Sequence, residues 1–186
     1  MSNLKQAIKQ NYVKCAKSPS YFINEFCTIQ HPQRGKIKFK LYPYQYDVLD
    51  EFEAHDYNVV LKSRQLGIST LSAAYALWMM LFHNDKNILC IATSKDTAKN
   101  LVTKVRIMYE GLPNWLKTAI VENNKLSLIF KNGSQIKAIA SNESAGRSEA
   151  LSLLILDEAA FIDKIDIIWT AAQQTLATGG QCIGIS

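Results

Sequence analysis

The segment at 58–82 constrains the fold more than any other part of the chain. It begins with a short apolar stretch at 58–61, passes through a polar, glycine-containing turn, and continues into an apolar run at 71–82. A short apolar strand followed by a turn and a long apolar helix forms a βα unit, which occurs where helices pack on a sheet. The sequence therefore predicts an α/β protein in which this turn joins a strand to a helix.

The turn is a partial match to the phosphate-binding loop G-x-x-x-x-G-K-[ST]. Gly67 matches the second glycine and Ser69 the hydroxyl. Lys62, however, stands where the first glycine is expected, and Ile68 stands where the lysine is expected. A triphosphate site needs N–H groups at a helix N-terminus, a cation near the β and γ oxygens, and a hydroxyl for Mg²⁺. Only the cation is displaced here.

The displaced cation decides whether this loop binds a nucleotide. Ile68 forms no charge-assisted hydrogen bond, a loss of about 1.5–3 kcal/mol unless another group replaces it. Lys62 and Arg64 belong to the same loop, and we expect Lys62 to be the substitute. A polar turn without a ligand is the alternative. The expected ATP-binding residues of the loop are Lys62, Ser63, Arg64, Gln65, Leu66, Gly67, Ile68, Ser69 and Thr70, and Ser69 or Thr70 supplies the hydroxyl for Mg²⁺.

An acidic pair follows a second apolar strand. The run at 151–156 ends directly on Asp157 and Glu158. The carboxyl ends of parallel strands are where open α/β sheets bind ligands. Asp157 is therefore expected to hold Mg²⁺ through its water shell, and Glu158 to act as the general base toward water. The alternative is an acidic helix cap after a strand.

With both motifs in place, the chain resembles the ATPase domain of the large terminase subunit of tailed bacteriophages. Residues 62–70 are similar to the variant Walker A loop of that family, in which some members carry the lysine at the start of the loop. Residues 153–161 are similar to Walker B with its catalytic glutamate. Residues 41–45 resemble the Q-type motif that terminases share with superfamily 2 helicases, and 144–148 resembles the segment that holds an arginine finger. The resemblance covers roughly residues 41–186.

The resemblance implies specific roles for three more residues. Gln45 and Tyr44 would contact the adenine, and Arg147 would neutralise charge on the transferred phosphoryl group, either within its own subunit or in a neighbour. The alternatives are a helix start for the Tyr-Pro-Tyr-Gln turn and a solvated side chain for the arginine.

The resemblance also implies a fold and a biological role. The fold is a P-loop NTPase domain of the RecA-like (ASCE) type. The role is hydrolysis of Mg-ATP coupled to translocation of double-stranded DNA into a procapsid, in the host cell cytoplasm. A homo-oligomeric ring on the portal protein, with the small terminase subunit as a partner, would carry it out.

The length of the chain predicts one domain, with 1–40 as an N-terminal helical segment and basic strand or loop. The resemblance implies that 41–186 is the ATPase core. The alternation of strands and helices predicts a mostly parallel central sheet with helices on both faces. The final apolar strand stops before the family's coupling motif and nuclease domain, so we expect a truncated form. Helices are expected at 1–30, 46–54, 69–82, 96–110 and 165–176, and strands at 58–61, 88–92, 126–130, 135–140, 151–156 and 181–185.

Composition supports an acidic partner and gives no sign of a membrane or metal-cluster protein. The formal net charge is +5 and no apolar run reaches membrane-spanning length. The segment 93–99 resembles helicase motif Ia, which makes nonspecific phosphate contacts, whereas the lysines at 36–40 are typical of a solvated edge strand. The four cysteines lack C-x-x-C spacing, so we expect free thiols and no zinc.

Two other functional classes fit the same motifs. A superfamily 2 helicase or related nucleic-acid-dependent ATPase would share the acidic pair and the Q-type motif, but helicases normally keep the loop lysine that Ile68 replaces. A non-catalytic nucleotide-binding assembly protein would also tolerate Ile68, although it has no need of Glu158.

Overall fold

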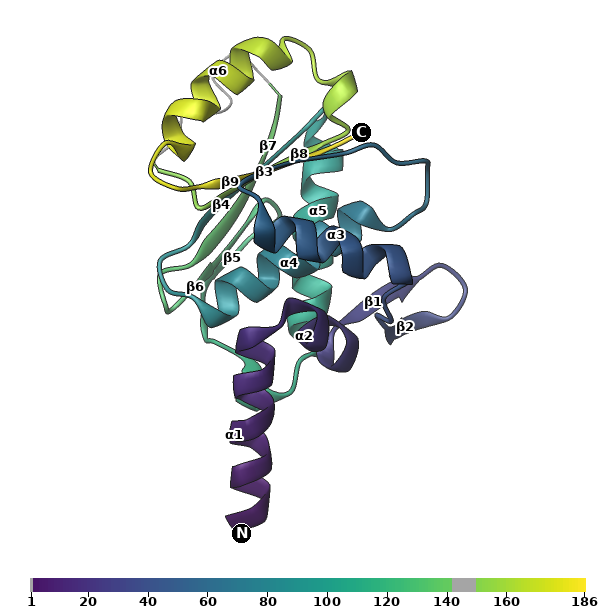
Figure 1. Ribbon diagram of the computed structural model, residues 1–186, viewed down its shortest axis with the longest axis vertical. Helices are drawn as coiled ribbons and strands as arrows, with labels where there is room; N and C mark the ends of the chain where they lie inside the picture. The colour runs from purple at the N-terminus through teal and green to yellow at the C-terminus, as the bar shows by residue number, and fades with distance from the viewer. Residues whose placement is uncertain (1, 142–149) are drawn as a thin grey trace.

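The computed structural model describes residues 2–141 and 150–186 and shows an α/β protein built on a seven-stranded sheet. The strand order is β3-β9-β8-β4-β7-β6-β5, and a separate two-stranded hairpin lies to one side (Figure 1). The strands are β1 Thr28–His31, β2 Gly35–Lys38, β3 Tyr57–Val60, β4 Asn87–Ala92, β5 Ile120–Asn123, β6 Ser127–Phe130, β7 Gln135–Ala140, β8 Leu153–Asp157 and β9 Gln181–Ile185. The helices are α1 Ser2–Lys17, α2 Pro19–Phe26, α3 Pro43–Ala54, α4 Ile68–Phe82, α5 Lys95–Gly111 and α6 Ile165–Leu176, with short 3₁₀ turns at Asn114–Leu116 and Ala159–Phe161.

The sheet is mostly parallel, as the sequence predicted. The five neighbouring strands β3, β9, β8, β4 and β7 pair in parallel. The pairings of β7 with β6 and of β6 with β5 are antiparallel, so β6 alone runs in the opposite direction. The predicted hairpin joins β6 to β7, and Gly133 takes a φ of 82° in its turn, a conformation that suits glycine. All the predicted strands are present, with shifts of one or two residues at some ends.

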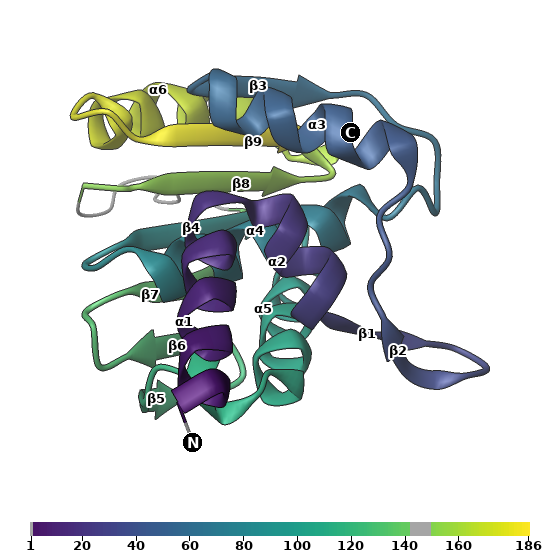
Figure 2. The ribbon, with the colours of Figure 1, turned by 60° about the horizontal axis from the view of Figure 1, so that its bottom comes forward.

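Alternation along the strands divides the core between the two faces of the sheet. Leu153 and Ile155 contribute to the larger core cluster, which contains α4 and α5. Leu154 and Leu156 contribute to a smaller cluster, which contains the buried side of α6. Figure 2 shows the strands in order from β3 at the top to β5 at the bottom, with α1 and α2 crossing in front of them. Helices therefore cover both faces: α6 packs on one, and the other helices pack on the other.

The N-terminal segment contains the main error of the sequence-based prediction. Helix α2 starts as expected, because Ser18 caps it by accepting a hydrogen bond from the Tyr21 amide at 3.1 Å. Residues 28–30, predicted to be helical, are instead part of β1. The backbone at Cys27 is extended, which ends the helix, and β1 then pairs antiparallel with β2. The second strand of this hairpin carries Lys36 and Lys38, two of the three lysines that the sequence placed on a solvated edge, and Lys40 lies beyond its end.

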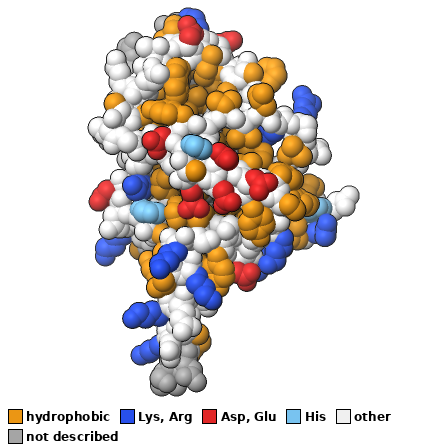
Figure 3. Space-filling view, viewed as in Figure 1, with side chains coloured by type: hydrophobic (Ala, Val, Ile, Leu, Met, Phe, Trp, Pro, Cys, Tyr) orange, Lys and Arg blue, Asp and Glu red, His pale blue; other side chains and the backbone are white. Residues whose placement is uncertain are grey.

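In the described part of the chain, no helix is long and apolar enough to span a bilayer. Apolar side chains are nevertheless exposed at the free edge of the sheet, where Tyr57 is 56% exposed and Val59 is 82% exposed. Figure 3 shows hydrophobic side chains gathered in the upper part of the molecule, where Figure 1 places α6 and β3, and lysines spread along α1 below.

Candidate active site

The phosphate loop runs from the end of β3 to the start of α4, as the sequence predicted. Its last residue, Gly67, caps the helix with a φ of 73°, in the left-handed region that glycine adopts without strain. Gln65 also has a positive φ, of 67°. The first N–H groups of any helix lack acceptors within that helix, and the helix dipole makes this end partly positive. The start of α4 is therefore suited to bind an anion.

The two residues that depart from the common motif, Lys62 and Ile68, lie in different environments. Ile68 is only 2% exposed and belongs to the larger core cluster, so its side chain is part of the hydrophobic core. Lys62 is half-buried at the start of the loop, and its backbone N–H donates to the Ser186 carbonyl at 2.7 Å. The loop lysine is thus anchored to β9 through its backbone, while its side chain forms no ion pair within the described residues.

The hydroxyl and the carboxylate expected to hold Mg²⁺ lie side by side. Ser69 Oγ donates a hydrogen bond to Asp157 Oδ1 at 2.8 Å, which joins the first turn of α4 to the carboxyl end of β8. Asp157 is only 7% exposed. One hydroxyl and one carboxylate fit Mg²⁺, which keeps several waters and takes one or two protein carboxylates. In the described part of the chain, no group of three or more histidine, cysteine or acidic residues is arranged so that it could hold a metal ion.

Glu158 is exposed next to this pair and has an unusual backbone. Its φ of 57° and ψ of 44° place a non-glycine residue in the left-handed region, where local strain is common at functional sites. Thr93 Oγ1, at the end of β4, donates to Glu158 Oε2 at 3.5 Å, which is a long contact. The carboxylate therefore lies at the carboxyl edge of the sheet, close to the phosphate loop.

The Q-type segment packs directly against the phosphate loop. Tyr44 Oη and Gln45 Nε2 both donate to the Leu66 carbonyl, at 2.8 Å and 3.1 Å. Gln45 is 1% exposed, and its Oε1 accepts from the Tyr42 amide at 3.1 Å. Both ends of the Gln45 amide are thus used within the protein. The structure gives Tyr44 and Gln45 a loop-supporting position that sequence reasoning missed, and adenine contact by these residues stays a prediction.

Two other predicted segments have different outcomes. Arg147 and its segment at 144–148 lie outside the described residues. The motif Ia segment follows β4 and opens α5, as expected, with Ser94 Oγ accepting from the Thr97 amide at 3.1 Å. This hydroxyl caps a helix in the structure, so its contact with phosphates also stays a prediction.

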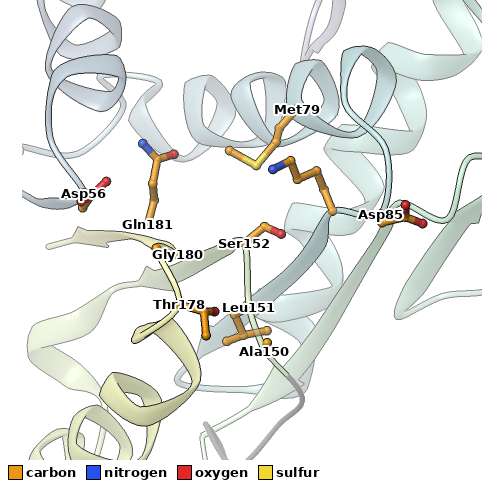
Figure 4. Close-up of a pocket in the computed structure, with 11 residues that line it drawn as sticks. Asp56, Met79, Asp85, Ala150, Leu151, Ser152, Thr178, Gly180 and Gln181 are labelled. Atoms are coloured by element: carbon orange, nitrogen blue, oxygen red, sulfur yellow. The ribbon is translucent and has the colours of Figure 1, made fainter.

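The opposite end of the sheet carries a separate pocket of about 390 Å³. It lies where β8 and β9 begin, and its lining includes Asp56, Ser152 and Gln181 (Figure 4). The Gln181 amide is already held there, since Nε2 donates to the Phe52 carbonyl at 2.9 Å and Oε1 accepts from Tyr75 Oη at 3.1 Å. The phosphate loop and the acidic pair lie at the other end of the strands.

Comparison with known proteins agrees with the geometry. Residues 59–182 match the family of the terminase large subunit, T4likevirus-type, N-terminal. Among solved structures, the large terminase of bacteriophage HK97 aligns with a TM-score of 0.70 at 23% identity, over 91% of this chain and 37% of that one. The large terminase ATPase domain of Thermus phage P74-26 aligns with a TM-score of 0.59 at 22% identity, over 80% of this chain and 65% of that one.

A third similar structure contains a nucleotide. The large terminase of a thermophilic bacteriophage, in complex with ADP, aligns with a TM-score of 0.59 at 14% identity, over 78% of this chain and 38% of that one. These alignments establish the P-loop, RecA-like fold. The chain spans well under half the length of the HK97 protein and of the ADP-bound protein. The family match covers most of the chain, from the phosphate loop to the last strand, and the chain therefore belongs to the terminase large subunit family, in its T4likevirus-type N-terminal part.

Proposed function

We propose that this chain binds Mg-ATP at the phosphate loop and hydrolyses it to drive double-stranded DNA into a procapsid, as the motor domain of a terminase large subunit. The observation that carries the proposal is the 2.8 Å hydrogen bond between Ser69 Oγ and Asp157 Oδ1. It brings together, from two distant parts of the sequence, the hydroxyl and the carboxylate that a Mg-nucleotide site requires.

The chain's own groups divide the binding of ATP among them. The first amides of α4 would bind phosphate oxygens, and Lys62 would supply the cation that Ile68 cannot. Ser69 and Asp157 would hold Mg²⁺, which when bound neutralises charge on the β- and γ-phosphates. The similar terminase of the thermophilic bacteriophage has been crystallised with ADP and with ATP-γ-S, which supports nucleotide binding on this fold.

Glu158 would act on the water that attacks the γ-phosphate. Its carboxylate is exposed beside Asp157, and Thr93 Oγ1 restrains one oxygen through the long contact at 3.5 Å. The other oxygen is then available to orient a water and accept its proton. Asp157, which is buried and bonded to Ser69, is less suited to this step.

The remaining roles follow from family membership. Arg147 would neutralise charge developing on the γ-phosphate, and Tyr44 and Gln45 would contact the adenine after their bonds to the loop rearrange. Double-stranded DNA, the portal protein and the small terminase subunit would be the partners of a ring of copies in the host cytoplasm. The family match favours this motor over the helicase class, since it covers residues 59–182 and so includes the variant loop, where Ile68 stands in place of the lysine that helicases normally keep.

Substitution Glu158→Gln tests the catalytic part of the proposal. The amide keeps the size of the side chain but cannot accept the proton, so we expect phosphate release to fall by about 10²- to 10⁴-fold. Binding of Mg-ATP should stay within about threefold of wild type. The measurements are phosphate release with double-stranded DNA present and titration with a fluorescent ATP analogue.

Glu122→Gln is a matched control, because Glu122 is an exposed glutamate on β5 at the far edge of the sheet. This variant should leave both quantities unchanged. Wild-type turnover by Glu158→Gln would exclude Glu158 as the base. Failure of the wild-type protein to bind Mg-ATP would exclude the proposed site as a whole.

A further inference from the structure

Lys104 reaches the phosphate-loop region from a different helix. It lies on α5, which packs against α4, and its side chain is half-buried. Lys104 and Thr70 line the same small pocket of about 130 Å³, together with Ile29, Gln30, Ile107 and Met108. Thr70 belongs to the first turn of α4 and directly follows Ser69. The lysine is therefore next to the helix end that forms the phosphate site.

The charge of Lys104 is coupled to the charges of that site. Burial lowers the pKa of Lys104, the Asp157 carboxylate opposes this by raising the pKa, and the Lys62 ammonium lowers it further. Lys104 therefore experiences the fields of both Asp157 and Lys62. In contrast to Lys36 and Lys40, it has no ion pair or hydrogen bond with any described residue.

A half-buried ammonium without an acceptor is unfavourable, because it loses hydration and gains no partner in return. An anion bound at the start of α4 would supply the missing negative charge. The same site lacks the usual lysine of the motif, since Ile68 is buried in the core. A phosphate group bound there would give the Lys104 ammonium the partner that it lacks among the described residues, and Lys104 would give the phosphate site the cation that Ile68 cannot supply.

We propose that Lys104 is a second cation of the nucleotide site, which stabilises the bound triphosphate from the α5 side while Lys62 acts from the loop. This inference rests on the proposed function, because it assumes that Mg-ATP binds at the start of α4. The two lysines together replace the single lysine of the common motif. Lys104 contributes as a point charge, whose interaction with phosphate is strong where water is partly excluded.

The test compares Lys104→Met, Lys104→Arg and Lys125→Met with wild type. Calorimetry with Mg-ATPγS gives the affinity, and thermal unfolding without nucleotide gives the stability. Lys125 is exposed between β5 and β6, at the far edge of the sheet, so Lys125→Met makes the same charge change away from the site.

The expected results separate a ligand-binding role from a structural one. Lys104→Met should weaken Mg-ATPγS binding about tenfold, the size of one lost charge-assisted contact. Lys104→Arg should stay within about threefold, and Lys125→Met within about twofold. The unliganded Lys104→Met protein should melt at the wild-type temperature or above it, because the variant lacks a partly desolvated charge that has no partner among residues 2–141 and 150–186.

Two outcomes overturn the inference and leave the proposed function intact. One is wild-type affinity in Lys104→Met while the wild-type protein binds Mg-ATPγS. The other is a lower melting temperature in Lys104→Met together with an equal loss of affinity in Lys104→Arg, which would show that Lys104 only supports the packing of α5. Absence of binding by the wild-type protein would instead overturn the proposed function.

Discussion

Helices α4 and α6 pack on opposite faces of one sheet, yet they are buried to very different extents. In α4 every residue at 71–81 is buried, including the polar Ser72. In α6 the buried residues are Ile168, Ala172 and Leu176, which form a single stripe. A helix that is apolar all round lies inside a protein, whereas a single apolar stripe is typical of a surface helix.

The difference shows how the phosphate site is held in place. Helix α4 contacts the sheet on one side and the N-terminal helices on the other, where Trp78 Nε1 donates to the Cys15 carbonyl at 2.8 Å. Helix α4 is thus packed on both sides, and its first turn is joined to β8 by the bond from Ser69 to Asp157. Helix α6 covers β8 and β9 but leaves Tyr57 and Val59 of β3 exposed. The fully buried helix α4 carries the phosphate site, and the partly exposed helix α6 does not.

The largest expected effect is on α4 itself. Leu77 is fully buried at the centre of this helix. Leu77→Ala should lower the free energy of unfolding by about 3 kcal/mol, through lost burial and a residual cavity. Ile167, on α6, is 41% exposed, and Ile167→Ala should change stability by less than about 0.5 kcal/mol. Urea unfolding measures both, and equal losses would contradict the distinction between the two layers.

The next effect concerns the carboxylate that meets α4. Asp157→Asn keeps an oxygen that can accept the hydrogen bond from Ser69 but removes the negative charge. We expect Mg-dependent nucleotide affinity to fall by about tenfold or more, the scale of one charge-assisted interaction. Stability without nucleotide should change by less than about 1 kcal/mol. Calorimetry with and without Mg²⁺ measures the affinity, and unchanged Mg²⁺ dependence would exclude Asp157 as the ligand.

A smaller effect is expected at the glycine that begins α4. Gly67→Ala combines a left-handed backbone with a Cβ that would lie 3.0 Å from Gln45 Nε2. Gly179, after α6, also has a positive φ, but its Cβ would have nothing within 4 Å. Both alanine variants should therefore lose about 1–2 kcal/mol of stability to backbone strain. Only Gly67→Ala should also weaken nucleotide binding, as measured by fluorescent ADP titration, and equal affinities in both variants would contradict this account.

The smallest expected effect is a difference in reactivity between two buried thiols, Cys182 in the smaller core cluster and Cys90 in the larger one. Burial raises the pKa of Cys182, under α6, to about 12, and burial also raises the pKa of Cys90, in the larger cluster. Native thiols should therefore react slowly at pH 8, since the thiolate is the reactive form. Cys182 should be labelled before Cys90, because the side of the sheet covered by α6 should open more readily than the side covered by α4 and α5. Mass spectrometry after timed alkylation gives the order, and earlier labelling of Cys90 would reverse the comparison.

The same raised pKa values set the pH dependence of stability. A buried thiol whose pKa is raised on folding stabilises the native state fully below the ordinary thiol pKa, near 8.5. That contribution is lost as the pH rises toward about 12 for Cys15 and Cys182. Unfolding free energy measured between pH 8 and pH 10 should therefore decrease, and Cys182→Ala should reduce the slope.

The central sheet could be predicted from the sequence because its signals are local and strong. Apolar strands such as β8, the Asn132-Gly133 turn, and the long apolar run of α4 each favour one conformation. Strand β5 was missed because all four of its residues are exposed, so no apolar pattern marks it. Strand β1 was missed because its pairing with β2 depends on the chain turning back at Gly35, a tertiary contact that local propensity does not contain.

The site was predictable in its motifs and not in its supporting contacts. Ser69 and Asp157 were placed in one metal site from two recognisable patterns, and the structure brings them together. The contacts of Tyr44 and Gln45 with the Leu66 carbonyl have no sequence signal, because a buried glutamine and a ligand-binding glutamine have the same pattern. Lys104 was missed for a related reason: it lies mid-helix on α5, in a segment without a motif.

The most direct measurement is the affinity for Mg-ATPγS, by calorimetry, of wild type, Lys62→Ala and Ile68→Val. Ile68→Val is chosen because Ile68 is buried and valine preserves most of its packing. The account expects Lys62→Ala to weaken binding by at least about tenfold, as a lost charge-assisted contact does, and Ile68→Val to bind within about threefold of wild type. Full affinity in Lys62→Ala would contradict the relocated lysine, and absence of binding by wild type would contradict the phosphate site itself.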